Sequence, residues 1–424
     1  MPTILELINS FRGPCSCGMC HETVIRDIEI SSGAVQRVGE ILTRNGFPKN
    51  ILLVADKNTF KASDGIMDSL NGFNIEQKIY DDLRVATMSE VSGLEELIKD
   101  RDIGVLSIGT GSINDPCRLA AARQDKPLCI FATAPSMDGF ASYGAPIVDR
   151  GFKLSYSAKS PEIIIGDTKI LASAPTDLKS AGFGDMIAKY VGLIDWRVSN
   201  LLIGERYCER VASLTKDAVD ELVSLADKVT ENDEVTAGKI FEALLKTGVG
   251  MSFMQNSRPA SGSEHIICHV LECKELQDGI IPNIHGVDVG VATLHMLKYY
   301  GQLANTERIN TRYEVVNWDE VYEFYGHLSD DVKKVNFPVS IMDGITPELL
   351  ESNWCIIRNI IKEYPTYDQC RDAMVKAGCK ITVDDIGKDK KLFNECVRYS
   401  PYMRMRLTLL RLSGMIGIYP RDAE

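Results

Sequence analysis

Apolar and polar residues along the first 175 positions follow the order expected for strands and helices in alternation. Short apolar runs that end in polar residues are typical of buried parallel strands. The strand candidates are residues 24–30, 51–56, 73–80, 104–108 and 128–132. Helical spacing over 89–100 and 116–124 separates some of these strands. The pattern predicts a doubly wound α/β sheet, whose ligands bind at the carboxyl ends of the strands.

Long helical periods replace this alternation after about residue 176. The clearest ones cover 177–198, 205–229, 233–253 and 287–303. The stretch 315–424 is also mostly helical in pattern, with breaks at Pro338, Pro347 and Gly378. Pro175 and Thr176 mark the expected boundary, with Asp177 as an N-cap candidate. We therefore predict an α/β domain over 1–175, an all-α domain over 176–424, and a cleft between them.

Charge and composition narrow the class of partner. The formal net charge of −12 disfavours nucleic acid and anionic membrane surfaces, because both require a basic face. A small phosphorylated substrate needs only a few local cations and stays compatible. Residues 1–20 lack a basic and apolar leader, and no apolar run reaches membrane-spanning length. We expect a cytoplasmic protein without membrane insertion, whose 12 cysteines are reduced.

Cysteine is concentrated near the start of the chain. Cys15, Cys17, Cys20 and His21 fall within seven residues, which is dense enough for a metal site. No second group of cysteine and histidine in the sequence completes four ligands, and one tight loop rarely supplies all of them. Both a metal site and a plain reduced turn before the strand at 24–30 therefore stay open.

A glycine turn follows the apolar run 104–108. Gly109 and Gly111 would allow close backbone approach, and a helix beginning at Pro116 would direct its N-terminus at a bound anion. The third glycine of a dinucleotide fingerprint is missing, so a ligand-free turn is an equal alternative. Asp56, at the end of another strand, could bind ribose hydroxyls or act as an ordinary turn residue.

A candidate metal set lies in the helical region. His265 and His269 are four residues apart on one helix face, His285 precedes a glycine at the next helix start, and Asp185 opens an earlier helix. Two imidazoles and one carboxylate form a common catalytic set with a free position for a substrate oxygen. Three of the six histidines lie between 265 and 285, which strengthens this interpretation over a packed pair.

Two cations are candidates for a substrate phosphate. Arg258 precedes a serine-rich helix start, and Lys153 follows the loop that carries Asp138. Solvated surface positions are the alternative for both. The basic stretch 404–411 is amphipathic, and we interpret it as a docking helix with solvated arginines.

Five segments together resemble glycerol-1-phosphate dehydrogenase, in particular its bacterial arabinose-operon-type branch. They are residues 109–115, 133–142, 181–186, 257–265 and 284–286. The parent group contains dehydroquinate synthase, glycerol dehydrogenase and the iron-containing alcohol dehydrogenases. The resemblance implies a dehydroquinate synthase-like architecture, with a Rossmann-like dinucleotide-binding domain and a helical metal- and substrate-binding domain. It implies reversible reduction of dihydroxyacetone phosphate to sn-glycerol 1-phosphate for glycerophospholipid synthesis, and a homo-oligomer of two or more chains.

The resemblance also implies residue roles. The metal ligands match Asp185, His265 and His285. Asp138 matches a residue near the substrate hydroxyls, and His269 matches the second histidine of the family's His-x-x-x-His, behind the metal ligands; both are the expected catalytic residues. Asp138, Lys153 and Arg258 are the expected substrate contacts. The expected cofactor contacts are Asp56, Gly109, Gly111, Ser112, Asp115, Thr133, Ser136 and Ser142. Thr110 stands where many relatives have glycine.

Several points stay open at this level. The cofactor is NAD(H) or NADP(H); Asp56 favours NADH by repelling a 2′-phosphate, but Lys57 could offset that. Zinc is the first expectation for the metal, while nickel and ferrous iron suit the same ligands. A sugar-phosphate cyclase of the dehydroquinate synthase type and another polyol dehydrogenase, such as glycerol dehydrogenase, are the rival enzymes. A metabolite-binding protein without turnover is the non-enzymatic alternative.

Overall fold

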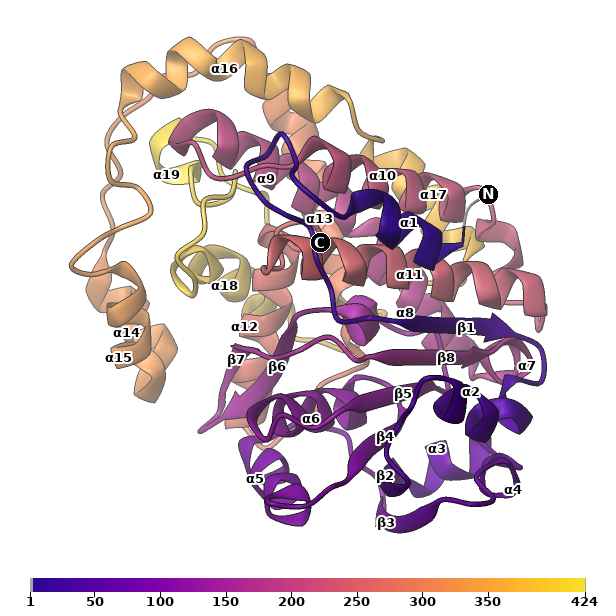
Figure 1. Cartoon of the computed structure of the whole chain (residues 1–424). Coiled ribbons are helices and arrows are strands. Elements are labelled where there is room, and N and C mark those ends of the chain that lie inside the picture. Colours follow the sequence, from indigo (N-terminus) through magenta and orange to yellow (C-terminus); the bar gives the residue numbers. More distant parts are fainter. Residues whose placement is uncertain (1–2, 424) are drawn as a thin grey trace.

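The computed structural model describes residues 3–423, with a sheet-based N-terminal region and a helical C-terminal region (Figure 1). This arrangement confirms the predicted fold class. Within the described residues, no helix combines the length and the apolarity needed to cross a membrane.

A parallel sheet organises the N-terminal region. Its six strands are β1 (Asp27–Ser31), β2 (Asn50–Asp56), β3 (Asn74–Tyr80), β4 (Gly104–Gly109), β5 (Leu128–Ala132) and β8 (Ile163–Asp167). Their order is β1-β8-β5-β4-β2-β3, and every neighbouring pair is parallel. All five predicted strands are present. We did not predict β8 because its apolar run is short, nor the antiparallel hairpin of β6 (Gly144–Asp149) and β7 (Phe152–Ser157).

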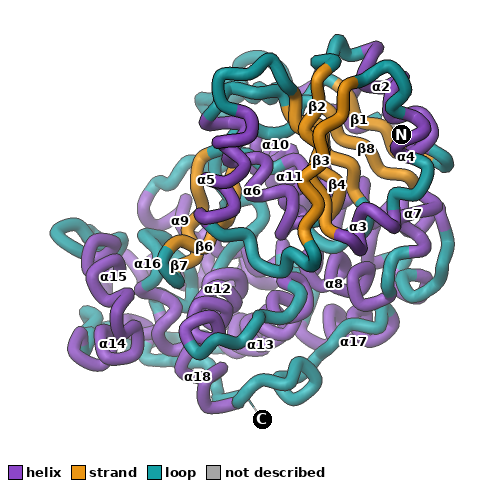
Figure 2. Tube along the Cα trace, turned by 90° about the horizontal axis from the view of Figure 1, so that it is seen from below, coloured by secondary structure: helices purple, strands orange, loops and turns teal. Residues whose placement is uncertain are grey.

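Helices cover both faces of the sheet (Figure 2). The helices of this region are α1 (Ile4–Phe11), α2 (Val38–Arg44), α3 (Lys57–Ala62), α4 (Ile66–Ser69), α5 (Met88–Ile98), α6 (Gly111–Arg123) and α7 (Thr168–Ser173). Residues of α2 and α4 pack on one face with Ile51, Leu53 and Leu106. Residues of α1, α5 and α6 pack in a second core with Leu52, Val54 and residues of the long helix α11. The shared core joins the sheet to the helical region.

The helical region follows the long periods of the sequence. Its helices are α8 (Thr176–Ile187), α9 (Lys189–Ile203), α10 (Glu209–Val223), α11 (Glu234–Met254), α12 (Ser263–Gln277), α13 (His285–Asn305), α14 (Trp318–Tyr325), α15 (Ser329–Asn336), α16 (Pro347–Lys362), α17 (Tyr367–Lys376), α18 (Lys390–Tyr399) and α19 (Ser413–Ile416). The single period over 177–198 forms two helices, α8 and α9. They meet at Ala188, which keeps helical dihedral angles, so the apolar spacing continues across the junction. Asp177 lies in the first turn of α8, whose N-cap residue is Pro175.

The last hundred residues complete the helical core rather than form a separate unit. Trp354 and Ile357 of α16 and Phe393 of α18 are buried in the same apolar cluster as Tyr300 of α13. Pro347 is the first residue of α16, and Pro338 and Gly378 follow α15 and α17, as their sequence pattern predicts. The predicted docking helix over 404–411 is absent, and this segment consists of bends, irregular backbone and turns.

Candidate active site

Three helices bring Asp185, His265 and His285 into one cluster. Asp185 lies near the end of α8, His265 in the first turn of α12, and His285 is the first residue of α13. Their ligand atoms all lie within 4.8 Å of one another. His265 Nε2 is 3.3 Å from Asp185 Oδ1, and the centroids of the His265 and His285 rings are 5.5 Å apart. The three side chains predicted as metal ligands therefore converge.

Two glycines permit this convergence through close backbone approach. A Cβ atom on Gly286 would lie 2.1 Å from the carbonyl oxygen of Ala181, so α13 could not approach α8 with a side chain there. A Cβ atom on Gly182 would lie 2.0 Å from the carbonyl oxygen of Pro135. Both distances are well inside van der Waals contact. These glycines place α8 against both α13 and the loop that follows β5.

Carboxylates behind the two histidines orient the imidazoles. His265 Nδ1 lies 2.6 Å from Glu264 Oε1, and His285 Nδ1 lies 3.0 Å from Glu272 Oε1. Because each carboxylate accepts a hydrogen bond from Nδ1–H, each Nε2 keeps a free lone pair. Asp185 Oδ2 accepts a hydrogen bond of 2.9 Å from the backbone of Asp138. Two imidazole nitrogens and one carboxylate, each held from behind, suit a divalent metal with an open coordination position.

A second possible metal group shares His285 with this cluster. It consists of Cys268, Glu272 and His285. Glu272 is already paired with Lys153 at 2.6 Å, and burial raises the pKa of the Cys268 thiol well above its ordinary value. Both facts disfavour metal binding there, so Glu272 is better described as the support of His285.

Lys189 is a functional residue that the sequence reasoning missed. Its side chain is fully buried, and its Nζ lies 2.6 Å from Asp138 Oδ2 and 2.7 Å from Asp185 Oδ1. Burial opposes its charge, but the carboxylates of Asp138 and Asp185 outweigh this effect and raise the pKa of Lys189. The lysine stays charged and holds the two carboxylates together. Its position four residues after Asp185, within the helical period predicted over 177–198, was the available signal.

The predicted phosphate-binding cations have protein partners. Lys153 pairs with Glu272, as noted. Arg258 is 2% exposed and pairs with Glu205 through Nε at 2.8 Å and Nη2 at 2.5 Å. Its Nη2 also donates to the Leu407 carbonyl at 2.9 Å. A substrate role for Arg258 stays a prediction, and this geometry favours a structural one.

Two other arginines, Arg404 and Arg406, are more exposed than Arg258, and Arg404 contacts one of the histidines. Arg404 Nη2 is 3.1 Å from His269 Nδ1, and the His269 ring stacks on His285 with centroids 5.4 Å apart. Arg406 donates to Ser261 Oγ at 2.7 Å and to Ser257 Oγ at 2.8 Å. Burial lowers the pKa of Arg406 to about 9, and the neighbouring Arg258 and Arg404 add to that shift. Placing these arginines on a solvated helix was wrong; they form a half-buried positive cluster beside the metal candidates.

His269 is held in its neutral form. Burial lowers its pKa well below the ordinary value, and the charges of Lys153 and Arg404 lower it further. Since arginine only donates, His269 Nδ1 must accept the bond from Arg404, so the proton lies on Nε2. A neutral imidazole with a defined N–H can donate a hydrogen bond to a reacting oxygen and relay a proton to it from solvent.

The glycine turn after β4 is shorter than predicted. Helix α6 begins at Gly111, so Pro116 lies inside the helix rather than at its start. Gly109 has φ +153° and a Cβ atom there would meet Ile113 Cγ1 at 3.0 Å. Thr110 is the N-cap residue and makes no side-chain cap bond. The first N–H groups of α6, at Gly111 and Ser112, are therefore suited to an anion.

The other predicted cofactor residues divide into two groups. Thr133 and Ser136 are buried in the loop after β5, and the backbone N–H of Thr133 donates to the Gly109 carbonyl at 3.4 Å. Asp56 ends β2 beside β4, as predicted, and Asp56 Oδ1 also caps α3 through a 2.8 Å bond from the Thr59 backbone. These residues share the carboxyl edge of the sheet with Gly111.

Asp115 and Ser142 contact a buried arginine instead. Arg118 is fully buried and donates to Asp115 Oδ1 at 3.1 Å, to Ser142 Oγ at 3.2 Å and to the Gly144 carbonyl at 3.0 Å. It also donates to the carbonyls of Gly139 and Phe140. Burial raises the pKa of Asp115 to about 6. This network fixes the loop that carries Asp138, and direct cofactor contacts by Asp115 and Ser142 stay predictions.

A cavity of about 410 Å³ opens next to the metal candidates. Ile284 and Gly286, the neighbours of His285, line it together with Asp177 and Ser180 of α8. Among the described residues, Arg84, from the loop that follows β3, is the one lining residue from the N-terminal region, and the others belong to the helical region. Asp185, His265 and His285 do not line this cavity, so it borders the start of α13 and is not the space enclosed by the metal candidates.

Comparison with known proteins agrees with this architecture. The family model "Iron-containing alcohol dehydrogenase" matches residues 29–175. Sulfoacetaldehyde reductase from Bifidobacterium kashiwanohense, solved in complex with NAD+, superposes with a TM-score of 0.60 at 16% identity and covers 97% of this chain and 96% of its own. At this identity the likeness concerns the fold, and it places the chain in the architecture of the iron-containing alcohol dehydrogenases.

Sequence relatives define the family more narrowly. Glycerol-1-phosphate dehydrogenase [NAD(P)+] from Halalkalibacterium halodurans is 32% identical over 309 residues, which are 71% of this chain and 77% of the relative. The protein of the same name from Geobacillus stearothermophilus is 29% identical over 420 residues, which are 97% of this chain and 98% of the relative. The chain belongs to the glycerol-1-phosphate dehydrogenase family, as its motifs suggested, and so to a family of oxidoreductases.

Proposed function

We propose that this protein catalyses the reversible, NAD(P)H- and metal-dependent reduction of dihydroxyacetone phosphate to sn-glycerol 1-phosphate, for glycerophospholipid synthesis. The observation that carries the proposal is the convergence of Asp185, His265 and His285 beside the loop after β5. The relatives named glycerol-1-phosphate dehydrogenase [NAD(P)+] support the choice of substrate and cofactor.

Asp185, His265 and His285 are the residues that would hold a divalent cation. When bound, the cation would supply a Lewis acid for the C2 carbonyl, and a nicotinamide cofactor would supply the hydride. Lys189 holds Asp185 and Asp138 in place through an ion pair with each carboxylate. Zinc is the metal we propose first, because imidazole and carboxylate ligands with one open position suit it.

The dinucleotide is proposed to bind along the carboxyl edge of the sheet. The N-terminus of α6, at Gly111 and Ser112, would receive its pyrophosphate, and Asp56 would accept hydrogen bonds from ribose hydroxyls. Thr133 and Ser136 lie in the loop that leads to Asp138, so they would contact the nicotinamide end. Lys57, whose charge could offset Asp56, is paired with Asp81 at 2.6 Å, which favours NADH over NADPH.

The proton and the phosphate are assigned to the side chains around His269. Reduction of C2 requires one proton at the C2 oxygen, and we propose that it arrives from solvent by a relay that includes the Nε2–H of His269. Arg404 and Arg406 are the cations we propose for the substrate phosphate, because both are partly exposed and lie beside the histidines or the α12 N-terminus. Arginine forms strong, bidentate bonds with phosphate oxygens.

An assay with dihydroxyacetone phosphate and NADH, with and without added zinc or nickel, tests the proposal. We expect a metal-dependent loss of NADH absorbance and sn-glycerol 1-phosphate as the chiral product. Turnover of a sugar phosphate without net oxidation of the cofactor would instead identify a cyclase of the dehydroquinate synthase type. Absence of turnover with every metal and both cofactors would refute the proposed activity.

A further inference from the structure

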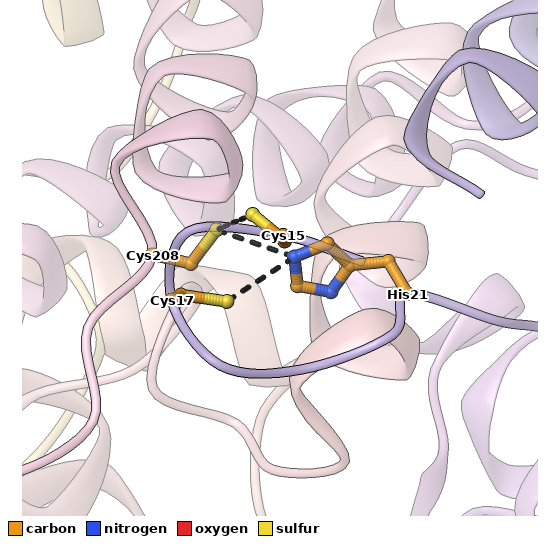
Figure 3. A group of neighbouring side chains, drawn as sticks. All are labelled: Cys15, Cys17, His21 and Cys208. Atoms are coloured by element: carbon orange, nitrogen blue, oxygen red, sulfur yellow. Dashed lines mark hydrogen bonds between the residues drawn. The ribbon is translucent and has the colours of Figure 1, made fainter. Parts of the chain in front are cut away.

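The cysteine-rich turn near the start of the chain meets a fourth ligand from a distant helix (Figure 3). Cys15, Cys17 and His21 come from the turn, and Cys208 is the N-cap residue of α10. The ligand atoms of these four residues all lie within 4.8 Å of one another. Cys20 is exposed and does not belong to the group.

The spacing of the four atoms fits a tetrahedral metal ion. Cys15 Sγ is 3.8 Å from Cys208 Sγ, and His21 Nε2 is 3.5 Å from Cys17 Sγ and 3.3 Å from Cys208 Sγ. Zinc bound at ~2.3 Å from sulfur and ~2.0 Å from nitrogen gives tetrahedral edges of about 3.5 to 3.8 Å. The sulfurs are too far apart for a disulfide, whose bond length is about 2.0 Å.

The surroundings prepare the ligands for a cation. His21 is fully buried, and its Nδ1 lies 3.4 Å from the Phe253 carbonyl, which leaves the Nε2 lone pair directed at the sulfurs.

The turn itself has the shape of a metal-binding knuckle. Cys15 and Met19 are joined by a 2.9 Å backbone hydrogen bond, and Gly18 donates to the Cys15 carbonyl at 2.9 Å. Pro14 and Cys20 form an antiparallel bridge that closes the loop. This backbone frame holds Cys15 and Cys17 on the side that faces Cys208 (Figure 3).

We propose that Cys15, Cys17, His21 and Cys208 bind a structural zinc ion, separate from the ion of the active site. All four positions come from the protein, so no position is left for a substrate. Binding displaces the thiol protons and joins one Zn²⁺ to three thiolates and one neutral imidazole. The site ties the segment before β1 to α10, and His21 and Cys208 are 187 positions apart in the sequence. Next to it, the Phe11 and Phe253 rings stack with centroids 5.0 Å apart.

Metal content of the full-length protein tests this proposal independently of catalysis. The parent variant is His265→Ala, which removes an active-site ligand and leaves the cysteine cluster intact. We expect about one zinc per chain in this parent and in the parent with Cys20→Ser, which is the matched control. We expect no bound zinc when Cys208→Ser is added, together with a fall in Tm of about 5–10 °C.

Titration of the unaltered folded protein with an organomercurial covers the case in which Cys208→Ser does not fold. Mercuration of the cluster should release one zinc that a chromophoric indicator detects, and cobalt substitution should give a thiolate-to-cobalt charge-transfer band. Zinc retained in the Cys208→Ser variant would overturn the proposal. Protein that folds with full Tm without metal, or with a Cys15–Cys208 disulfide, would overturn it as well. None of these outcomes depends on the proposed reduction of dihydroxyacetone phosphate.

Discussion

The two ligand clusters of this protein differ in donor type, closure and surroundings. Asp185, His265 and His285 offer one oxygen and two nitrogens from three helices and leave room for a further ligand. The cysteine cluster offers three sulfurs and one nitrogen, closed by a turn and a helix start. Charged side chains such as Lys189 surround the first, whereas the rings of Phe11 and Phe253 lie beside the second. The contrast separates a site arranged to act on a ligand from one arranged to hold the chain together.

The strongest test of this contrast is Asp185→Asn. An amide is a poor metal ligand, so we expect loss of the active-site metal and a fall in kcat of about 10³-fold or more. Elemental analysis should still find one zinc per chain, in the cysteine cluster. Asp217→Asn, an exposed change on α10, is the control and should behave as the unaltered protein does. Full activity of Asp185→Asn would contradict the assignment of this ligand.

Glu272→Gln tests whether the support behind His285 matters for the open site alone. A neutral amide accepts the hydrogen bond from His285 Nδ1 more weakly than the carboxylate and loses the ion pair with Lys153. We therefore expect the active-site metal to bind about 10- to 100-fold more weakly. Competition with a chromophoric chelator measures this affinity. Glu363→Gln, in an exposed pair with Arg197, is the matched control. Equal weakening of the zinc in the cysteine cluster would show that the effect is general unfolding.

Arg404→Met tests whether the positive cluster makes the open site selective for phosphate. A lost charge-assisted bond of about 1.5–3 kcal/mol should raise KM for dihydroxyacetone phosphate by about 10- to 100-fold. The KM for unphosphorylated dihydroxyacetone should not change, whereas kcat should fall alike for both substrates because Arg404 also bonds His269 Nδ1. Arg398→Met, which breaks an exposed pair with Glu320, serves as the control. An unchanged KM would mean that Arg404 does not bind the phosphate, and Lys153 and Arg258 would again be the candidates.

The smallest effect is expected at Asp56, the group farthest from the chemistry. Serine keeps the N-cap of α3 but removes the negative charge. The ratio of kcat/KM with NADPH to that with NADH should therefore rise about five- to tenfold. Asp64→Ser, on the exposed turn after α3, is the control. If the ratio is unchanged, Asp56 serves only as the helix cap.

Local patterns in the sequence were sufficient for much of this architecture. Apolar runs of strand length predicted β1 to β5, and the change to long helical periods predicted the second region. They missed β8 because three consecutive isoleucines are too short to stand out, and they merged α8 with α9 because helical spacing continues through Ala188. Side-chain periodicity reports the local backbone, so it does not detect such a junction.

For the candidate site as well, some residues could be predicted from the sequence and others only from the tertiary structure. The sequence by itself predicted Asp185, His265 and His285 as metal ligands, from residue types that bind metal and from the motifs that carry them, and the structure brings these three side chains together. Only the tertiary structure decided the partners of these residues, such as Lys189 between two carboxylates and Arg404 beside His269. It also supplied Cys208, which lies 193 residues from Cys15 in the chain and 3.8 Å from it between sulfurs. Contacts between distant segments depend on how helices pack, and no local spacing carries that information.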